Sequence, residues 1–266
     1  MNELPNVVEI KKIINEAEDV KTFFFDYKVD FKTGQFFMLW IPGFDEKPFA
    51  VSYYENKVLG ITIHKIGPFT TKIFSMKKKD KIGIRGPYGN GFKIKNKACV
   101  VGGGVGMAEL SMLIEKLKNP VIVNGARSKK NLVFLKRFSG KKVYITTDDG
   151  SFGEKGFTTD ILRKVLEKEK FGIIYTCGPE IMMKKIFEMC EKYKIECQAS
   201  LERYMSCGFG ICGKCMIDDK ILCTDGPVLS SRDLRNLTEF GHFARLRSGK
   251  KVLLAEYYEG KNVIVN

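Results

Sequence analysis

Histidine is scarce in this sequence. Only His64 and His242 occur among 266 residues, although histidine is the side chain that most often carries protons near neutral pH. Acid–base catalysis by histidine therefore has few candidates. His64 lies in a run that alternates apolar and polar residues and is expected to be structural, whereas His242 lies in a C-terminal tail without a readable motif.

Long hydrophobic runs are also missing. The longest apolar stretch is short and interrupted by glycine, which excludes a membrane-spanning helix. The first residues, MNELPNVVEIKK, contain no apolar segment of the kind found in secretory signals. We therefore expect a cytoplasmic protein that does not bind a membrane. In that reducing compartment, clustered cysteines bind metal or do redox chemistry rather than form disulfides.

The sequence shows no low-complexity tract and no internal repeat. Its hydrophobic content of 44% is typical of a globular protein. A chain of 266 residues has room for two domains and a small appendage.

The net charge of +14 is high, but the lysines are dispersed, as in KKIINEAEDVK and MKKKDK. Arginine interleaved with aromatic residues, as in RNA-binding surfaces, is not seen, so nucleic acid is the least favoured partner. A solvated surface is the favoured interpretation of the charge, and a docking face for an acidic protein comes second. A Lys-rich and Ile-rich composition also fits the surface of a thermophilic protein.

Four cysteines form the most specific motif. Cys207, Cys212, Cys215 and Cys223 lie in CGFGICGKCMIDDKILC, which has the spacing C-x4-C-x2-C followed by a fourth cysteine. The first three spacings match the loop that binds a 2Fe-2S cluster in plant-type ferredoxins. The glycines of this loop, at positions 208, 210 and 213, allow the tight and partly left-handed turns that a loop around a cluster needs. The motif predicts one-electron transfer.

A structural zinc site fits the four cysteines less well. Such sites usually have two separated C-x2-C pairs, and this loop has one. The remaining cysteines are scattered among apolar neighbours and are expected to be small buried hydrophobic residues. They are Cys99, Cys177, Cys190 and Cys197.

The pattern of apolar runs divides the chain into three segments. Residues 1–95 contain short apolar runs about ten residues apart, which predicts an antiparallel β-barrel, with one helix near 70–77. Residues 96–200 alternate uniformly apolar strands with helices, which predicts a doubly wound parallel α/β domain. One of these helices is expected at 129–138. Residues 201–266 hold the cysteine loop, a small hairpin at 216–222 and the tail.

Glycine-rich turns mark candidate phosphate sites. Gly102, Gly103, Gly104 and Gly106 follow a predicted strand and open a helix, where a parallel sheet binds nucleotides. Alone, this motif is weak, because glycine also permits close packing of a strand on a helix. In IGPFTTKIF, Thr70 and Thr71 are placed to donate to a phosphate, although Thr70 is also a plausible helix cap. The turn GPYGNGF at 86–92 is a third candidate.

Taken in order, the motifs KPFAVSYY, GPFTTKIF, GPYGNGF, GGGVGMAEL, TCGPEIMM and C-x4-C-x2-C resemble the ferredoxin reductase superfamily. Within it, the chain is most similar to the electron-transfer subunits of type B dihydroorotate dehydrogenases in their archaeal form. The resemblance covers nearly the whole chain. It implies an FAD-binding barrel at residues 1–95, an NAD-binding α/β domain at 96–200 and a 2Fe-2S module with a tail at 201–266.

The resemblance also implies cofactor-binding residues. The flavin motif is matched by Lys47, Pro48, Phe49, Ala50, Val51 and Ser52, with Lys47 in place of the family's arginine and Ala50 in place of a serine that bonds the flavin. The loop for the FAD diphosphate is matched by Ile66, Gly67, Thr70 and Thr71. The NAD ribose and diphosphate are assigned to the glycines at 102–106, and the nicotinamide to Cys177, Gly178 and Pro179. Glu109 replaces a common proline, and no chemistry is attached to it.

By this resemblance, electrons pass between NAD, FAD, the cluster held by the four cysteines, and the FMN of a separate catalytic subunit that oxidises dihydroorotate to orotate. All three segments are occupied by cofactor binding, so no segment remains for an organic-acid pocket. We therefore expect a subunit with no catalytic residues of its own for dihydroorotate, in a heterotetramer of two chains of each kind. Alternatives are the equivalent subunit of a sulfhydrogenase or of a ferredoxin:NADP oxidoreductase and, more distantly, a zinc-binding regulatory module.

Overall fold

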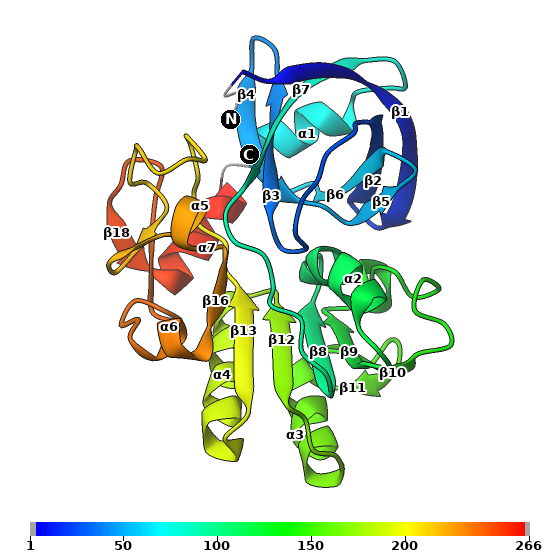
Figure 1. The fold of residues 1–266 in the computed structure, drawn as a ribbon, viewed down its shortest axis with the longest axis vertical. Coiled ribbons are helices and arrows are strands. Elements are labelled where there is room, and N and C mark those ends of the chain that lie inside the picture. The colour runs from blue at the N-terminus through cyan, green and yellow to red at the C-terminus, as the bar shows by residue number, and fades with distance from the viewer. Residues whose placement is uncertain (1–3, 264–266) are drawn as a thin grey trace.

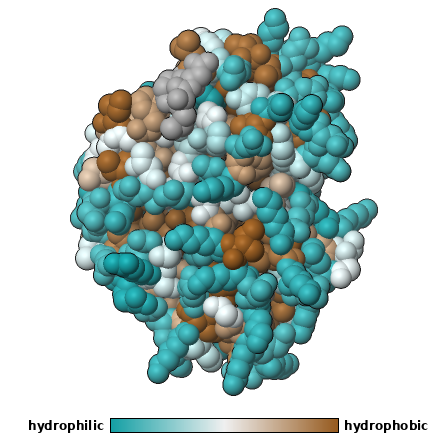
Figure 2. Space-filling model, in the orientation of Figure 1, coloured by the Kyte–Doolittle hydropathy of each residue, from teal (hydrophilic) through white to brown (hydrophobic). Residues whose placement is uncertain are grey.

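The structure, a computed structural model, describes residues 4–263. Three parts are visible in Figure 1: an N-terminal β-structure, an α/β sheet with helices, and a smaller C-terminal part beside both. Hydrophilic residues cover most of the face in Figure 2, with apolar residues in scattered patches. This surface agrees with the dispersed lysines of the sequence.

The N-terminal part is an antiparallel sheet of seven strands in the order β4-β3-β7-β1-β2-β6-β5. Its strands are β1 (Asn6–Ala17), β2 (Val20–Asp26), β3 (Phe36–Ile41), β4 (Asp45–Ala50), β5 (Tyr53–Glu55), β6 (Val58–His64) and β7 (Lys81–Tyr88). Just after β4, the Ser52 N–H donates to the Gly60 carbonyl of β6 at 2.9 Å. Residues 51–52 lead directly from β4 at one end of the sheet to β5 at the other, so the sheet closes into a barrel.

Aromatic and branched side chains fill the barrel. Phe23, Phe37 and Ile61 are fully buried there because alternate residues of each strand point inward. Helix α1 (Pro68–Phe74) also contributes Phe69 and Ile73 to this core. The helix begins two residues earlier than the predicted 70–77, since Pro68 suits a first helical turn.

The second sheet has the order β11-β10-β9-β8-β12-β13-β16. Its strands are β8 (Ala98–Gly103), β9 (Val121–Ala126), β10 (Lys142–Thr147), β11 (Glu154–Lys155), β12 (Ile173–Cys177), β13 (Glu196–Ser200) and β16 (Val228–Ser230). The first six strands are parallel, and β16 is antiparallel to β13.

Helices cover both faces of this sheet, as predicted. Helix α2 (Gly106–Lys116) packs with Val100 and its neighbours on one face, whereas α3 (Thr158–Lys168) and α4 (Glu180–Tyr193) pack with Val101 and its neighbours on the other. Residues next to each other in a strand face opposite sides, so uniformly apolar strands supply both cores. The fold class expected from the sequence is confirmed.

The prediction of a helix at 129–138 is wrong. Only a short 3-10 turn, η1 (Lys129–Asn131), forms there. Phe134 has a left-handed backbone (φ 62°), and the Val133 carbonyl accepts a hydrogen bond from the Asn124 side chain at 3.0 Å. The apolar residues of this segment are buried against the α2 side of the sheet as an irregular loop, so their burial does not need helical spacing.

The C-terminal part is built from short elements. They are β14 (Met216–Ile217), β15 (Lys220–Ile221), α5 (Leu222–Asp225), α6 (Ser231–Arg235), β17 (Phe243–Arg245), β18 (Lys251–Leu253) and α7 (Leu254–Val263). The predicted hairpin is confirmed as β14 and β15, joined at Asp218 and Asp219. Because β16 returns to the α/β sheet, this part is tied to the preceding one. The domain divisions at 95 and 200 stay a prediction.

Candidate functional site

A cavity of about 340 Å³ lies where the three parts meet. This volume is in the range of sites for small molecules and cofactors. Its walls include several of the predicted cofactor residues: Lys47, Pro48, Phe49, Ala50, Ile66, Gly67, Thr70 and Gly106. The other predicted residues, all within the described part of the chain, lie outside its walls: Val51, Ser52, Thr71, Gly102, Gly103, Gly104, Cys177, Gly178 and Pro179. The structure therefore brings the flavin motif and the start of α2 to one space.

Lys47 lies on the barrel side of the cavity. Its Nζ is 2.5 Å from a carboxylate oxygen of Asp45 and 5.5 Å from the centre of the Tyr204 ring. The side chain is partly exposed, at 26%. A cation at this point of the wall favours an anionic ligand, and the ion pair with Asp45 fixes the position of the Lys47 ammonium group.

The Thr70 hydroxyl organises the turn before α1. It accepts hydrogen bonds from the N–H groups of Ile66 at 2.8 Å and Gly67 at 2.9 Å, and it donates to the Gly67 carbonyl at 3.0 Å. The hydroxyl is thus occupied within its own loop. Thr71 is exposed on the same helix.

The glycine-rich turn after β8 packs directly against the turn after β12. A Cβ added to Gly106 would lie 2.5 Å from the Cys177 carbonyl oxygen, and one added to Gly103 would lie 2.9 Å from a Pro179 ring carbon. Close packing therefore requires glycine at these positions. Gly104 differs, because it has a left-handed backbone (φ 55°) and no atom lies within 4 Å of an added Cβ. Gly104 is the position where open space adjoins bare backbone.

The turn at residues 86–92 binds the C-terminal part. The Asn90 side chain donates to the carbonyls of Thr224 and Asp225, both at 3.0 Å, and Gly89 packs against Gly226. The glycines at this boundary therefore allow close approach of the segment that follows Cys223.

The four cysteines of the loop lie together as two pairs. The thiols of Cys207 and Cys212 are hydrogen-bonded to each other, and so are those of Cys215 and Cys223. Cys215 and Cys223 are buried, Cys207 is half-buried and Cys212 is exposed. No three His, Cys, Asp or Glu side chains within residues 4–263 are grouped so as to hold a single metal ion. Two pairs of thiols fit a two-iron cluster, in which each iron takes two protein ligands.

Backbone amides surround these sulfurs. The Gly210 N–H donates to the Cys223 sulfur at 3.1 Å. Burial raises the pKa of Cys207, but hydrogen bonds from the backbone of Cys212 and Phe209 outweigh burial and lower the pKa to about 6. A hydrogen bond from the Cys223 thiol lowers the pKa of Cys215 to about 7. Cys207 and Cys215 thus favour the thiolate, the form that binds iron, whereas the hydrogen bond to Cys215 and burial raise the pKa of Cys223.

The glycines of the loop have the expected conformation. Gly208, Gly210 and Gly213 have φ values of 85°, 91° and 66°, a region that only glycine enters at low cost. An added Cβ at Gly208 would lie 3.3 Å from Met38 and 3.4 Å from Tyr88, so the loop packs on the barrel. The prediction of left-handed turns is confirmed. The cysteines outside the loop are all buried, as predicted.

Known proteins resemble this chain over nearly its full length. A family model described as the iron-sulfur cluster binding domain of dihydroorotate dehydrogenase B matches residues 202–235. A Methanocaldococcus jannaschii protein named probable dihydroorotate dehydrogenase B (NAD(+)), electron transfer subunit, is 48% identical over 258 residues, or 94% of this chain and 99% of that protein. A Pyrococcus horikoshii protein of the same name is 45% identical over 247 residues, or 91% and 96%.

The chain belongs to the family of dihydroorotate dehydrogenase B electron transfer subunits. Among solved structures, one chain of the NADH-dependent reduced ferredoxin-NADP oxidoreductase, solved in work on flavin-based electron bifurcation, matches this protein with a TM-score of 0.79 and 27% identity. The match covers 98% of this protein and 97% of that chain. A cytochrome P450 reductase from Amycolatopsis has the same fold, with a TM-score of 0.62 at 17% identity over 72% of this chain and 66% of its own.

The family resemblance did not reveal the wall opposite the flavin motif. That wall comes from residues 201–205, which follow β13, and from Tyr257 of α7. Residues after the carboxyl end of a parallel strand usually contact ligands. Because 201–205 follow the predicted last strand, the sequence could have marked them as cavity residues. No local signal marks Tyr257, since only folding of the tail brings it to the cavity.

Within residues 4–263, no helix is long and apolar enough to cross a membrane.

Proposed function

We propose that this chain is the NAD-linked electron-transfer subunit of a dihydroorotate dehydrogenase. One observation carries the proposal: the flavin-motif cavity and the cysteine loop share a wall. Met205 lines the cavity, and Cys207 follows two residues later. Phe36 also lines the cavity, its ring lies 5.8 Å from that of Tyr88, and Tyr88 contacts the loop at Gly208. A cofactor in the cavity and a cluster in the loop would be neighbours.

The residues fit three cofactors. FAD would be held by residues 47–52 of the barrel and by the backbone of the turn at 66–71, because the Thr70 hydroxyl is already engaged. NAD would bind at Gly102–Gly106 and at Cys177, Gly178 and Pro179, where two glycine turns meet. A 2Fe-2S cluster would take Cys207, Cys212, Cys215 and Cys223 as ligands. We also propose the three-part division into an FAD barrel, an NAD domain and a cluster module with its tail.

The cofactors supply the redox chemistry: a flavin exchanges hydride with nicotinamide and single electrons with an iron–sulfur cluster. This chain supplies the positions. The barrel and α2 enclose the cavity, and the loop presents the partly exposed Cys207 and Cys212 at the surface. We propose that an FMN-containing catalytic subunit docks there in the cytoplasm, that it oxidises dihydroorotate to orotate, and that two chains of each kind assemble.

A second candidate keeps the cofactors and changes the partner. The match to the NADH-dependent reduced ferredoxin-NADP oxidoreductase at 27% identity favours a subunit of that kind as the runner-up. A sulfhydrogenase subunit belongs to the same group of alternatives. Both would have the same barrel, nucleotide domain and cluster loop.

The test measures the cofactor content of the purified protein and its activity with the catalytic partner chain. Protein prepared without oxygen should contain FAD, iron and acid-labile sulfide, and it should absorb visible light, which a zinc protein does not. With the dihydroorotate-oxidising chain of the same organism, it should form NADH from NAD+ and dihydroorotate. Cofactors without orotate formation would favour the second candidate. A colourless zinc protein would contradict both.

A further inference from the structure

Glu109 is an acid held deep between α2 and the two neighbouring strands. It lies in the first turn of α2. Its carboxyl accepts hydrogen bonds from the Cys177 thiol, at 3.2 Å, and from the Ser200 hydroxyl. Cys177 ends β12 and Ser200 ends β13. Glu109 is also part of the cavity wall, which explains why it keeps some exposed surface although it lies deep in the protein.

The surroundings of Glu109 favour a protonated carboxyl. Its two hydrogen-bond donors are uncharged, and burial raises the pKa of Cys177 far above its ordinary value, so that the thiol keeps its proton. The nearby charged group is Glu202, another acid. Burial raises the pKa of Glu109 to about 7, aided by Glu202 and opposed by the hydrogen bonds from Ser200 and Cys177.

Other polar groups face the same cavity from the remaining elements. They are Lys47 of β4, Thr62 and His64 of β6, Arg203 and Tyr204 after β13, and Tyr257 of α7. Burial lowers the pKa of His64 below its ordinary 6.5. Glu109 is the cavity group that is hydrogen-bonded to both strand ends and whose pKa burial raises to about 7.

In the proposed function, reduction of NAD+ by electrons from the cluster consumes one proton. NAD+ accepts a hydride, which is two electrons and one proton, whereas an iron–sulfur cluster delivers single electrons. For each NADH formed from two such electrons, one proton must enter the cavity from water. In the opposite direction, one proton must leave it.

We propose that the Glu109 carboxyl holds and exchanges this proton, an inference that rests on the proposed function. When NADH is formed, the O–H bond of Glu109 breaks, and its proton passes to the flavin that we propose to bind in the cavity. The resulting carboxylate regains a proton from water, which reaches the cavity wall at the exposed Glu202. The two electrons come from the cluster, so no other reductant is needed. In NADH oxidation, the carboxylate takes the proton and releases it to water.

Two half-reactions separate this role from a structural one. Hydride transfer between NADH and the bound flavin carries its own proton, but electron exchange with a one-electron acceptor such as ferricyanide does not. In Glu109→Gln, we expect electron transfer to ferricyanide to slow about a hundredfold, the usual size of general acid–base effects, and to lose its pH dependence. The rate of hydride transfer between NADH and the flavin should stay within about twofold of the wild-type rate. Glu115→Gln is the matched control, since it changes an exposed acid of the same helix.

A readout independent of turnover is the infrared carbonyl band of a protonated carboxyl. In the wild type this band should disappear with a midpoint near neutral pH. It should be missing in Glu109→Gln and unchanged in Glu115→Gln. If Glu109→Gln does not fold, the wild-type pH profiles remain decisive: only the one-electron half-reaction should change near neutral pH.

The outcomes distinguish this inference from the proposed function. Flavin and iron are assayed on the same samples. If they are missing, the proposed function fails and this inference with it. If they are present and both half-reactions fall equally, or neither changes, or the band does not titrate near neutral pH, only the role of Glu109 is overturned.

Discussion

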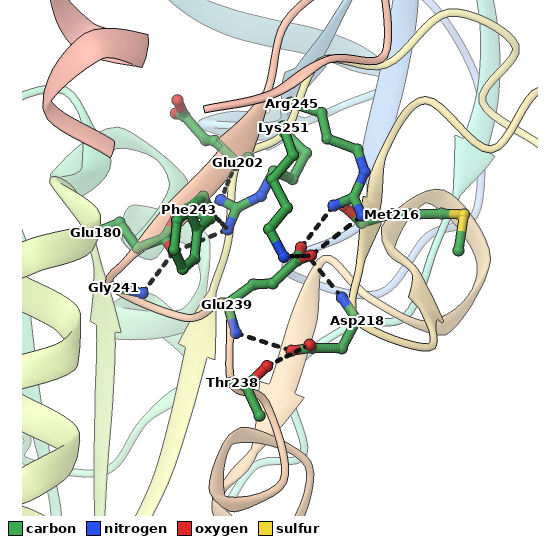
Figure 3. A network of polar contacts seen from close by, with 11 residues as sticks. Glu180, Glu202, Met216, Asp218, Thr238, Glu239, Gly241, Phe243, Arg245 and Lys251 are labelled. Atoms are coloured by element: carbon green, nitrogen blue, oxygen red, sulfur yellow. Dashed lines mark hydrogen bonds and ion pairs between the residues drawn. The ribbon is translucent and has the colours of Figure 1, made fainter. Parts of the chain in front are cut away.

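Arg203 and Glu180 form an ion pair that is almost completely enclosed, with side chains 1% and 3% exposed. Arg203 belongs to the cavity wall after β13, and Glu180 is the first residue of α4. Glu180 also accepts a hydrogen bond from the Gly241 N–H at 2.8 Å (Figure 3). Arg203 donates a hydrogen bond to the Phe243 carbonyl at 3.2 Å. One buried pair thus joins α4 of the α/β part, the cavity and the tail.

Breaking this pair should destabilise the protein strongly. Glu180→Gln or Arg203→Met alone leaves a buried charge without its partner, and we expect a loss of about 3–5 kcal/mol in the free energy of unfolding. The double variant should cost less than the sum of the two. Urea unfolding followed by circular dichroism measures all three values. Additive losses below about 1 kcal/mol each would show that the pair contributes little.

Glu239 should make the protein sensitive to acid. Burial raises its pKa, but hydrogen bonds from Arg245 and Lys251 outweigh burial and hold the pKa at about 2 (Figure 3). Because the folded state binds the proton less tightly than the unfolded chain, the stabilisation is complete above about pH 4.5 and is lost as pH falls towards 2. The lowered pKa of Glu239 corresponds to about 3 kcal/mol of folding stability at neutral pH. Unfolding midpoints should show a shallower acid limb in Glu239→Gln, whereas the exposed Glu167→Gln should match the wild type.

Cys212→Ser should remove the cluster and spare the flavin. One lost thiolate leaves an iron without its second ligand, while the cavity lies on the other side of the Phe36 and Tyr88 wall. Iron and sulfide content and electron transfer to the partner should fall to background, and reduction of bound FAD by NADH should continue. Loss of FAD reduction to the same extent would contradict the separation of the two sites.

Lys47→Ala should weaken FAD retention. The variant removes the cation at the cavity wall and leaves Asp45 without its partner at 2.5 Å. A charge-assisted hydrogen bond contributes roughly 1.5 kcal/mol, so the FAD dissociation constant should rise about tenfold. Flavin fluorescence titration of the apoprotein measures it. Lys65→Ala, which alters a surface ion pair with Asp19, is the control. Equal affinity in both variants would show that Lys47 does not contact FAD.

The cysteine loop should be covered in the complex. Ile211 is 79% exposed and Phe209 36% exposed, and electron transfer requires the cluster to lie close to the partner's cofactor. Hydrogen exchange at residues 207–213 should slow when the catalytic subunit binds. Ile211→Asp should weaken that binding at least tenfold, whereas Ile94→Asp, which alters another exposed apolar residue, should not. Unchanged exchange in a stable complex would place the interface elsewhere.

Local patterns predicted most of the elements. The strand and the helix predicted on either side of the glycine turn at 102–106 form as β8 and α2, and the hairpin between Cys215 and Cys223 forms as expected. These segments have strong apolar periodicity or clear turn residues. The segment 129–138 failed because its apolar residues are buried through the irregular path around Phe134, and tertiary burial overrides helical propensity.

Spacing along the chain was enough to predict the parallel sheet, the glycine turns and the four-cysteine loop. Packing of the folded chain brings Met205 and Tyr257 to the flavin-motif cavity and places Glu109 against Cys177 and Ser200. These contacts join residues far apart in the chain. Their geometry depends on how the barrel, sheet and tail pack, which no local spacing encodes.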